Sequence, residues 1–126
     1  TPTWNHWGNG PTNARYQPAS RGGLSPADVG DLELRWAFAF PAAARARSQP
    51  AVTREAIFTG SQSGFVYALN PEDGCVWWTF DAASEVRSAP VLGTDASGRV
   101  DRLYFGDFDG NMYAVAARTG QLVWKT

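Results

Sequence analysis

Residues 57–80 read IFTGSQSGFVYALNPEDGCVWWTF, and residues 103–126 read LYFGDFDGNMYAVAARTGQLVWKT. The second stretch repeats the first without a gap, 46 residues further along the chain. Identical residues recur at Gly60 and Gly106, Gly64 and Gly110, Tyr67-Ala68 and Tyr113-Ala114, Gly74 and Gly120, and Trp78 and Trp124. Periods of about 40–50 residues with four strands each are typical of β-propeller blades. The repeat therefore predicts an all-β propeller fold.

The repeat extends upstream through two further matches. Arg47-Ser48-Gln49-Pro50 mirrors Arg87-Ser88-Ala89-Pro90, and Leu34-Arg35-Trp36-Ala37-Phe38 mirrors Val76-Trp77-Trp78-Thr79-Phe80. The difference in spacing is absorbed by residues 93–101, whose Gly, Asp and Ser predict a loop. The chain therefore holds two full repeats and the last strand of a third.

Each full repeat divides into four predicted strands. They are 51–53, 56–60, 65–69 and a strand ending at Trp78 in the first repeat, and 91–92, 103–106, 111–115 and a strand ending at Trp124 in the second. Turns at 61–64 and 107–110 supply Gly where a positive φ is needed. A Trp that recurs once per repeat is best explained by packing between neighbouring blades, because its ring is large and apolar while its N–H still needs a partner.

The predicted organisation is a partial β-propeller. We expect an N-terminal extended segment at 1–31 and propeller blades over 32–126, divided into a closing outer strand at 32–40 and blades at 46–80 and 86–126. Propellers use about 4–8 blades, and an isolated arc would leave strand edges and apolar faces exposed. The expected partners are therefore the remaining blades of a larger protein or other copies of this chain.

Composition excludes several other classes of protein. The formal net charge is -1 and no basic stripe is visible, so nucleic-acid binding is not expected. The longest apolar run falls far below the roughly 20 residues of a membrane span. Cys75 is the only cysteine, which leaves no internal disulfide, and there is no C-x-x-C-H for a covalently attached haem.

The blade pattern resembles that of the eight-bladed quinoprotein alcohol dehydrogenases, which use pyrroloquinoline quinone (PQQ). The N-terminal residues are similar to the polyvinyl alcohol dehydrogenase branch of that family. The resemblance is carried by Trp4-x-x-Trp7-Gly8, Asn13-Ala14-Arg15-Tyr16-Gln17, Gly23-Leu24-Ser25, Leu34-Arg35-Trp36-Ala37-Phe38, Gly64-Phe65-Val66-Tyr67-Ala68-Leu69, Gly74-Cys75-Val76-Trp77-Trp78-Thr79-Phe80 and Val86-Arg87. It implies that this chain corresponds to the N-terminal portion of such an enzyme.

The resemblance implies a cofactor site on the propeller axis, where the loops before the innermost strands converge. Arg47 and Arg87 occupy equivalent positions in those loops, and their guanidinium groups would pair with the three carboxylates of PQQ. Ser88 and Gln49 are further candidates for hydrogen bonds to it. A purely structural role, bonding loop carbonyls in the central channel, is the alternative for both arginines.

The resemblance also implies a calcium ion beside PQQ, a small or polymeric alcohol as substrate, a cytochrome as electron acceptor, and a periplasmic or secreted location. The calcium ligands and the catalytic base would lie in other blades, so this chain alone is expected to bind neither cofactor. This chain departs from the family at two points. Relatives fused to cytochrome c carry C-x-x-C-H, which this sequence lacks. Relatives of methanol dehydrogenase carry adjacent cysteines where this sequence reads Arg87-Ser88-Ala89.

Other polar residues are interpreted as structural. Asp107-x-Asp109-Gly110-Asn111 looks like half of a calcium loop, but its place at a hairpin turn favours turn chemistry. His6 is the only histidine and has no second ligand nearby, so no metal site is predicted there. Cys75 is expected to be a small buried thiol. Asn13 and Arg15 are expected to anchor the N-terminal segment across the ring.

Two other classes of function stay open at this point. The same blade occurs in non-catalytic propellers, such as scaffold lipoproteins of outer-membrane assembly and sensor ectodomains. A fragment that assembles into ring-shaped homo-oligomers without redox activity is the third possibility.

Overall fold

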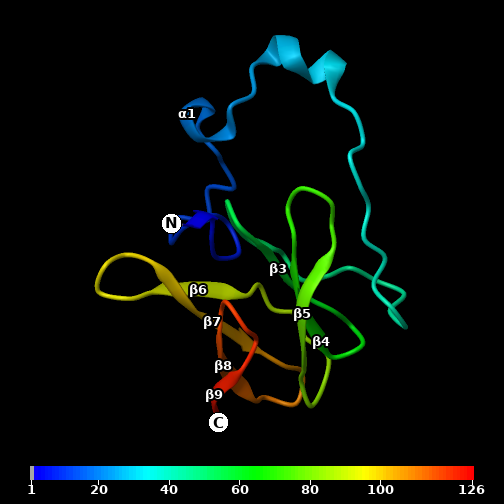
Figure 1. The fold of residues 1–126 in the computed structure, drawn as a ribbon, viewed down its shortest axis with the longest axis vertical. Coiled ribbons are helices and arrows are strands. Elements are labelled where there is room, and N and C mark those ends of the chain that lie inside the picture. Colours follow the sequence, from blue (N-terminus) through cyan, green and yellow to red (C-terminus); the bar gives the residue numbers. More distant parts are fainter. Residues whose placement is uncertain (1) are drawn as a thin grey trace.

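The strands form two antiparallel sheets, ordered β1-β2-β3-β4-β5 and β6-β7-β8-β9 (Figure 1). A computed structural model describes residues 2–126. Its elements are β1 (Pro2–Trp4), α1 (Ala19–Gly22), the 3-10 helix η1 (Pro26–Asp31), β2 (Ala51–Thr53), β3 (Ile57–Gly60), β4 (Phe65–Leu69), β5 (Val76–Asp81), β6 (Val91–Thr94), β7 (Val100–Gly106), β8 (Met112–Ala116) and β9 (Leu122–Lys125). The order β2 to β5 and β6 to β9 is that of two consecutive four-stranded blades, as the repeat predicts.

The register of the two sheets repeats with the sequence. Gly60 lies opposite Val66 in the first sheet, and Gly106 lies opposite Met112 in the second. The turns between these strands place Gly64 at φ 88° and Gly110 at φ 86°. This left-handed region is open to Gly at no steric cost, which confirms the predicted role of both glycines.

The N-terminal part differs from the expected extended segment. Strand β1 pairs with β2 and adds a fifth strand to the first sheet. The side chain of Asn5 then reaches the second sheet, where it accepts from the backbone N–H of Leu92 at 2.8 Å and donates to its carbonyl at 2.9 Å. Asn5 therefore links the inner edges of the two blades. Further along, α1 and η1 interrupt the segment with short helical turns.

The predicted outer strand at 32–40 is not observed as a strand within residues 2–126. A strand is held by its neighbour's main chain, and no strand of the two sheets pairs with this segment. Its aromatic side chains contact the first blade instead, since the rings of Phe38 and Phe40 lie 5.2 and 5.8 Å from that of Tyr67. The other predicted domain boundaries stay predictions.

The loop expected at 93–101 is largely a hairpin. Strand β6 continues to Thr94 and β7 begins at Val100. The Asp95 carboxylate organises the tight turn between them, accepting hydrogen bonds from Ser97 and from the backbone N–H of Arg99. The turn predicted here is confirmed, but it occupies only the residues between Thr94 and Val100.

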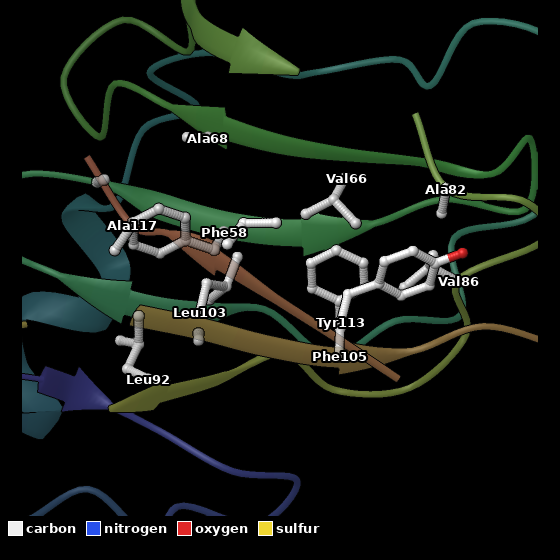
Figure 2. Close-up of a cluster of buried hydrophobic side chains, with 13 residues drawn as sticks. Phe58, Val66, Ala68, Ala82, Val86, Leu92, Leu103, Phe105, Tyr113 and Ala117 are labelled. Atoms are coloured by element: carbon white, nitrogen blue, oxygen red, sulfur yellow. The ribbon is translucent and has the colours of Figure 1, made fainter. Parts of the chain in front are cut away.

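The apolar core lies between the two sheets (Figure 2). Phe58 and Val66 of the first sheet face Leu103 and Phe105 of the second, and all four side chains are buried. Phe80, from β5, packs its ring 5.6 Å from that of Phe105 and 5.5 Å from that of Tyr113. The alternation of inward and outward side chains along each strand thus supplies one apolar layer shared by two blades.

Trp36 and Trp78, which occupy equivalent positions of the repeat, each pack against the next blade. The indole of Trp36 lies against Gly74 and donates its Nε1–H to the carbonyl of Pro71 at 3.0 Å. Trp78 repeats this arrangement at the equivalent residues, against Gly120 and with the carbonyl of Ala117 at 3.1 Å. Both observations confirm the predicted packing of these Trp residues between blades.

Candidate functional site

The segments that lead into β2 and β6, here called the approach segments (residues 46–50 and 86–90), lie side by side. Ser48 Oγ accepts from the backbone N–H of Gly60 at 3.1 Å and donates to the carbonyl of Ser88 at 2.8 Å. It therefore ties its own blade to the approach segment of the next. The four residues proposed for cofactor binding all lie on these two neighbouring segments.

Arg87 is held by two partners from its own blade. Its Nε donates to Oε2 of Glu85, Nη2 forms an ion pair with the same oxygen, and the guanidinium carbon lies 4.3 Å above the centre of the Phe108 ring. A guanidinium has five N–H donors, so three remain free. The side chain of Arg87 is 30 % exposed and that of Glu85 is 32 % exposed, so the pair lies partly at the surface.

Arg47 is exposed and differs from Arg87 in its surroundings. Among residues 2–126 its guanidinium makes no hydrogen bond or ion pair. Gln49 is half-buried, and its amide is likewise without a partner in the part of the chain that the structure describes. Both side chains retain their full capacity to donate to an anionic ligand.

The hydroxyl of Ser88 is already engaged. Its Oγ accepts from the backbone N–H of Gly106 at 3.1 Å and donates to the carbonyl of the same residue at 2.9 Å. The single hydroxyl proton is thus used within the blade, and only acceptor capacity remains for a ligand. Ser48 makes the corresponding bond to Gly60, so the Ser at this place serves the blade in both repeats.

Asp107 is committed to its own turn. Its carboxylate accepts from Asn111 Nδ2 at 2.8 Å, from the Tyr113 hydroxyl at 2.9 Å, and from the backbone N–H groups of Asp109 and Asn111. Burial raises the pKa of this carboxyl, but the hydrogen bonds from Asn111, Tyr113 and Asp109 together outweigh it, and the net pKa lies below 3.8. These contacts support turn chemistry here, as predicted.

Cys75 corrects another expectation, because it is exposed rather than buried. It stands just before β5, an outer strand whose side chains are largely exposed. The side chain of Asp73 raises the pKa of its thiol, through a hydrogen bond and through its negative charge, so the position does not favour a reactive thiolate. Asn13 and Arg15 are also exposed, and their anchoring role stays a prediction.

A groove of about 380 Å³ lies at the ends of the strands that are opposite the approach segments. Phe58, Trp78 and Ala117 are among its lining residues, with Glu55, Arg99 and Arg118 around them. None of the four proposed cofactor residues lines it. The groove is the space beside the docked Trp78, whereas the approach segments lead into β2 and β6 at the opposite ends of the strands.

Sequence reasoning missed the partners of Arg87. Glu85 lies two residues before it on an extended segment, and side chains at i and i+2 point to the same side of such a segment. That spacing was a usable signal for the Glu85 contact. Phe108 carried no comparable signal, because it lies 23 positions after Glu85 in the chain. Only the fold brings the two together, where the backbone N–H of Phe108 donates to the Glu85 carbonyl at 2.9 Å.

Comparison with known proteins gives consistent matches along the chain. The family model for the β-propeller domain of PQQ-containing glucose, ethanol and alcohol dehydrogenases matches residues 4–125. Polyvinylalcohol dehydrogenases of Pseudomonas sp. and Sphingopyxis sp. (strain 113P3) are 41% and 38% identical over 98% of this chain. The chain spans 19% and 18% of their respective lengths.

Among solved structures, the quinohemoprotein alcohol dehydrogenase of Comamonas testosteroni superposes with a TM-score of 0.78. The match covers 98% of this chain and 19% of that protein, at 23% sequence identity. At that identity the likeness concerns the fold, and it shows that the two sheets are arranged as blades of a propeller.

Proposed function

The chain belongs to the family of PQQ β-propeller domains of glucose, ethanol and alcohol dehydrogenases, and from this we propose that it supplies two neighbouring blades and part of the cofactor site to a quinoprotein that oxidises alcohols. The full protein to which these blades would belong is called the complete propeller below. The proposed substrates are secondary alcohols, including polyvinyl alcohol, because the relatives named for that substrate match 98% of the chain.

The observation that carries the proposal is the convergence of the two approach segments. The Ser48–Ser88 hydrogen bond of 2.8 Å brings them together, and each segment carries an arginine at the equivalent position. Two guanidinium groups on adjacent segments suit a ligand with several carboxylates, since each can bind one in a bidentate manner.

The available donors fit such a ligand in part. Arg47 and Gln49 have no partner among residues 2–126, and Arg87 keeps three N–H groups free. Ser88 fits less well, because its proton is bonded to Gly106. We therefore propose Arg47, Arg87 and Gln49 as the residues of this chain that would hold PQQ, with Ser88 shaping the segment.

When bound, PQQ supplies the two-electron acceptor for oxidation of an alcohol to a carbonyl compound. The residues of this chain would bind and orient it, and their positive charge would favour its more anionic reduced form. Calcium, a cytochrome acceptor and a periplasmic location are further proposals that rest on the family. No helix within residues 2–126 is long and apolar enough to cross a membrane.

The test is reconstitution of the complete propeller with PQQ and calcium, followed by alcohol-dependent reduction of an artificial dye. We expect dye reduction with a secondary alcohol only after both additions. Arg47→Ala should raise the PQQ concentration needed for half-maximal activity by about tenfold, as expected for loss of a charge-assisted hydrogen bond. Absence of activity with intact folding would favour the non-catalytic propeller instead.

A further inference from the structure

We infer that Glu85 and Phe108 are positioning residues that hold the Arg87 guanidinium with one edge free to receive a ligand carboxylate. The inference rests on the proposed function, and it adds two residues that sequence reasoning did not assign. Three contacts join Arg87, Glu85 and Phe108, so that each of these residues touches the other two.

The first two contacts restrain the guanidinium itself. Nε donates to Oε2 of Glu85 and Nη2 forms an ion pair with the same oxygen, so Glu85 occupies the side of the guanidinium that carries Nε and Nη2. The guanidinium carbon lies 4.3 Å above the centre of the Phe108 ring, a cation–π geometry. The outer hydrogens of Nη1 and Nη2 are left as a free pair of parallel donors.

The third contact fixes the two partners to each other. The backbone N–H of Phe108 donates to the Glu85 carbonyl at 2.9 Å. This bond joins the β7–β8 turn to Glu85, the residue immediately before the second approach segment. Phe108 is 64% exposed, so its ring is held at the surface by this bond and by Arg87 rather than by burial in the core. An exposed ring in this place is explained by the side chain that it covers.

Orientation, rather than stability, is the role that the magnitudes favour. An ion pair of which each side chain is about a third exposed contributes little to the stability of the fold. A free arginine side chain carries substantial rotamer entropy, and immobilising it at a binding site costs affinity. The contacts with Glu85 and Phe108 immobilise the Arg87 side chain before a ligand binds, so less side-chain entropy is lost on binding.

The first blade offers a comparison within the same chain. Its equivalent of Glu85 is Arg45, and its equivalent of Phe108 is Gln62. Arg47 therefore lacks both supports and is exposed. The two arginines occupy matching positions in the repeat, yet only Arg87 is held in a defined orientation.

The test measures the dissociation constant of PQQ for the complete propeller by equilibrium dialysis, in the absence of any alcohol. Glu85→Ala should weaken binding about three- to tenfold, the range expected when one long side chain must be immobilised on binding. Glu85→Gln should stay within about twofold of the parent protein, because its amide oxygen still accepts from the guanidinium. Glu55→Gln, on the opposite face, is the matched control and should change nothing.

Double variants that also carry Arg87→Ala test whether Glu85 and Phe108 act on PQQ binding through Arg87. In an Arg87→Ala background, Glu85→Ala should cause no further loss, because its partner is already absent. Phe108→Leu, which keeps apolar bulk but removes the ring, should weaken binding about twofold to threefold in the parent background and not at all with Arg87→Ala.

The outcomes separate this inference from the proposed function. Equal binding by Glu85→Ala and Glu85→Gln, or a Glu85→Ala effect that persists without Arg87, would overturn the positioning role while PQQ binding itself stands. If the folded parent protein fails to bind PQQ with calcium present, the proposed function is wrong and the positioning role goes with it.

Discussion

The indole of Trp78 lies so close to Gly120 that a Cβ atom on that residue would stand 2.6 Å from Trp78 Cε3. The same relationship joins Trp36 to Gly74, where the corresponding distance is 2.7 Å. In each pair the indole N–H also donates to the carbonyl three residues before the Gly. The Gly is thus required twice, for its positive φ and for the space that the ring occupies.

Gly120→Ala should destabilise the protein by about 2–4 kcal/mol, because it combines a left-handed residue with a clash against Trp78. Gly98→Ala is the matched control. Gly98 has φ 77° against 70° for Gly120, but nothing lies within 4 Å of a Cβ built there. It should cost only about 1 kcal/mol. Urea unfolding of both variants measures the difference, and equal losses would show that Trp78 moves aside freely.

Trp78→Phe should cost about 1–3 kcal/mol, because it leaves the Ala117 carbonyl without its donor and removes part of the packed ring. Trp77→Phe, on the adjacent and 58% exposed residue, should stay within about 0.5 kcal/mol of the parent. Thermal unfolding of the two variants under identical conditions checks this. A similar loss for both would mean that the indole hydrogen bond contributes nothing.

Asn5→Ala should loosen the contact between the inner strands, since the Asn5 amide pairs with both backbone groups of Leu92. The expected loss is about 1–3 kcal/mol. Hydrogen exchange of the Leu92 amide gives a local readout and should quicken. Asn5→Asp keeps the acceptor but removes the donor, so it should protect the Leu92 N–H better than Ala does. Unchanged exchange in both variants would contradict the proposed link.

Asp107 should contribute a pH-dependent part of stability. Its pKa in the folded protein lies below its ordinary value of 3.8, so folding favours the ionised form. The contribution is full above the unfolded value and is lost as pH falls through the lowered folded value. Asp107→Asn should therefore flatten the loss of stability between about pH 5 and about pH 2.

Urea midpoints measured across that range test the Asp107 prediction. Asp109→Asn is the control, because its exposed side chain accepts none of the hydrogen bonds of this turn. Its acid profile should match that of the parent. A parallel flattening in both variants would point to the net charge of the turn rather than to the bonds on Asp107.

The repeat predicted most of the fold because the same strand pairing and the same Trp packing occur in both blades. Gly60, Gly64 and Trp78 recur at Gly106, Gly110 and Trp124, and each turn or strand found in one blade has its counterpart in the other. Residues 32–40 keep the Trp packing of the repeat through Trp36 but form no strand in the structure. A strand needs a neighbouring main chain, and a matching sequence cannot supply one.

Of the candidate site, the sequence predicted only the residues that occupy equivalent positions in the two repeats. Equivalent positions identified Arg47 and Arg87 together, but their surroundings differ because Arg45 and Gln62 replace Glu85 and Phe108. The engagement of the Ser88 hydroxyl depends on the closeness of the Gly106 backbone, which no side-chain pattern reveals. The role of Asn5 was hidden for the same reason, since its partner is the backbone of a residue 87 positions away.

The decisive measurement is a crystal structure of the complete propeller grown with PQQ and calcium. We expect cofactor density beside the joined approach segments, with the free edge of Arg87 and the guanidinium of Arg47 donating to its carboxylates and the Glu85 and Phe108 contacts preserved. Cofactor density elsewhere, for example in the groove between Phe58 and Ala117, with both arginines turned away from it, would show that the approach segments do not form the cofactor site.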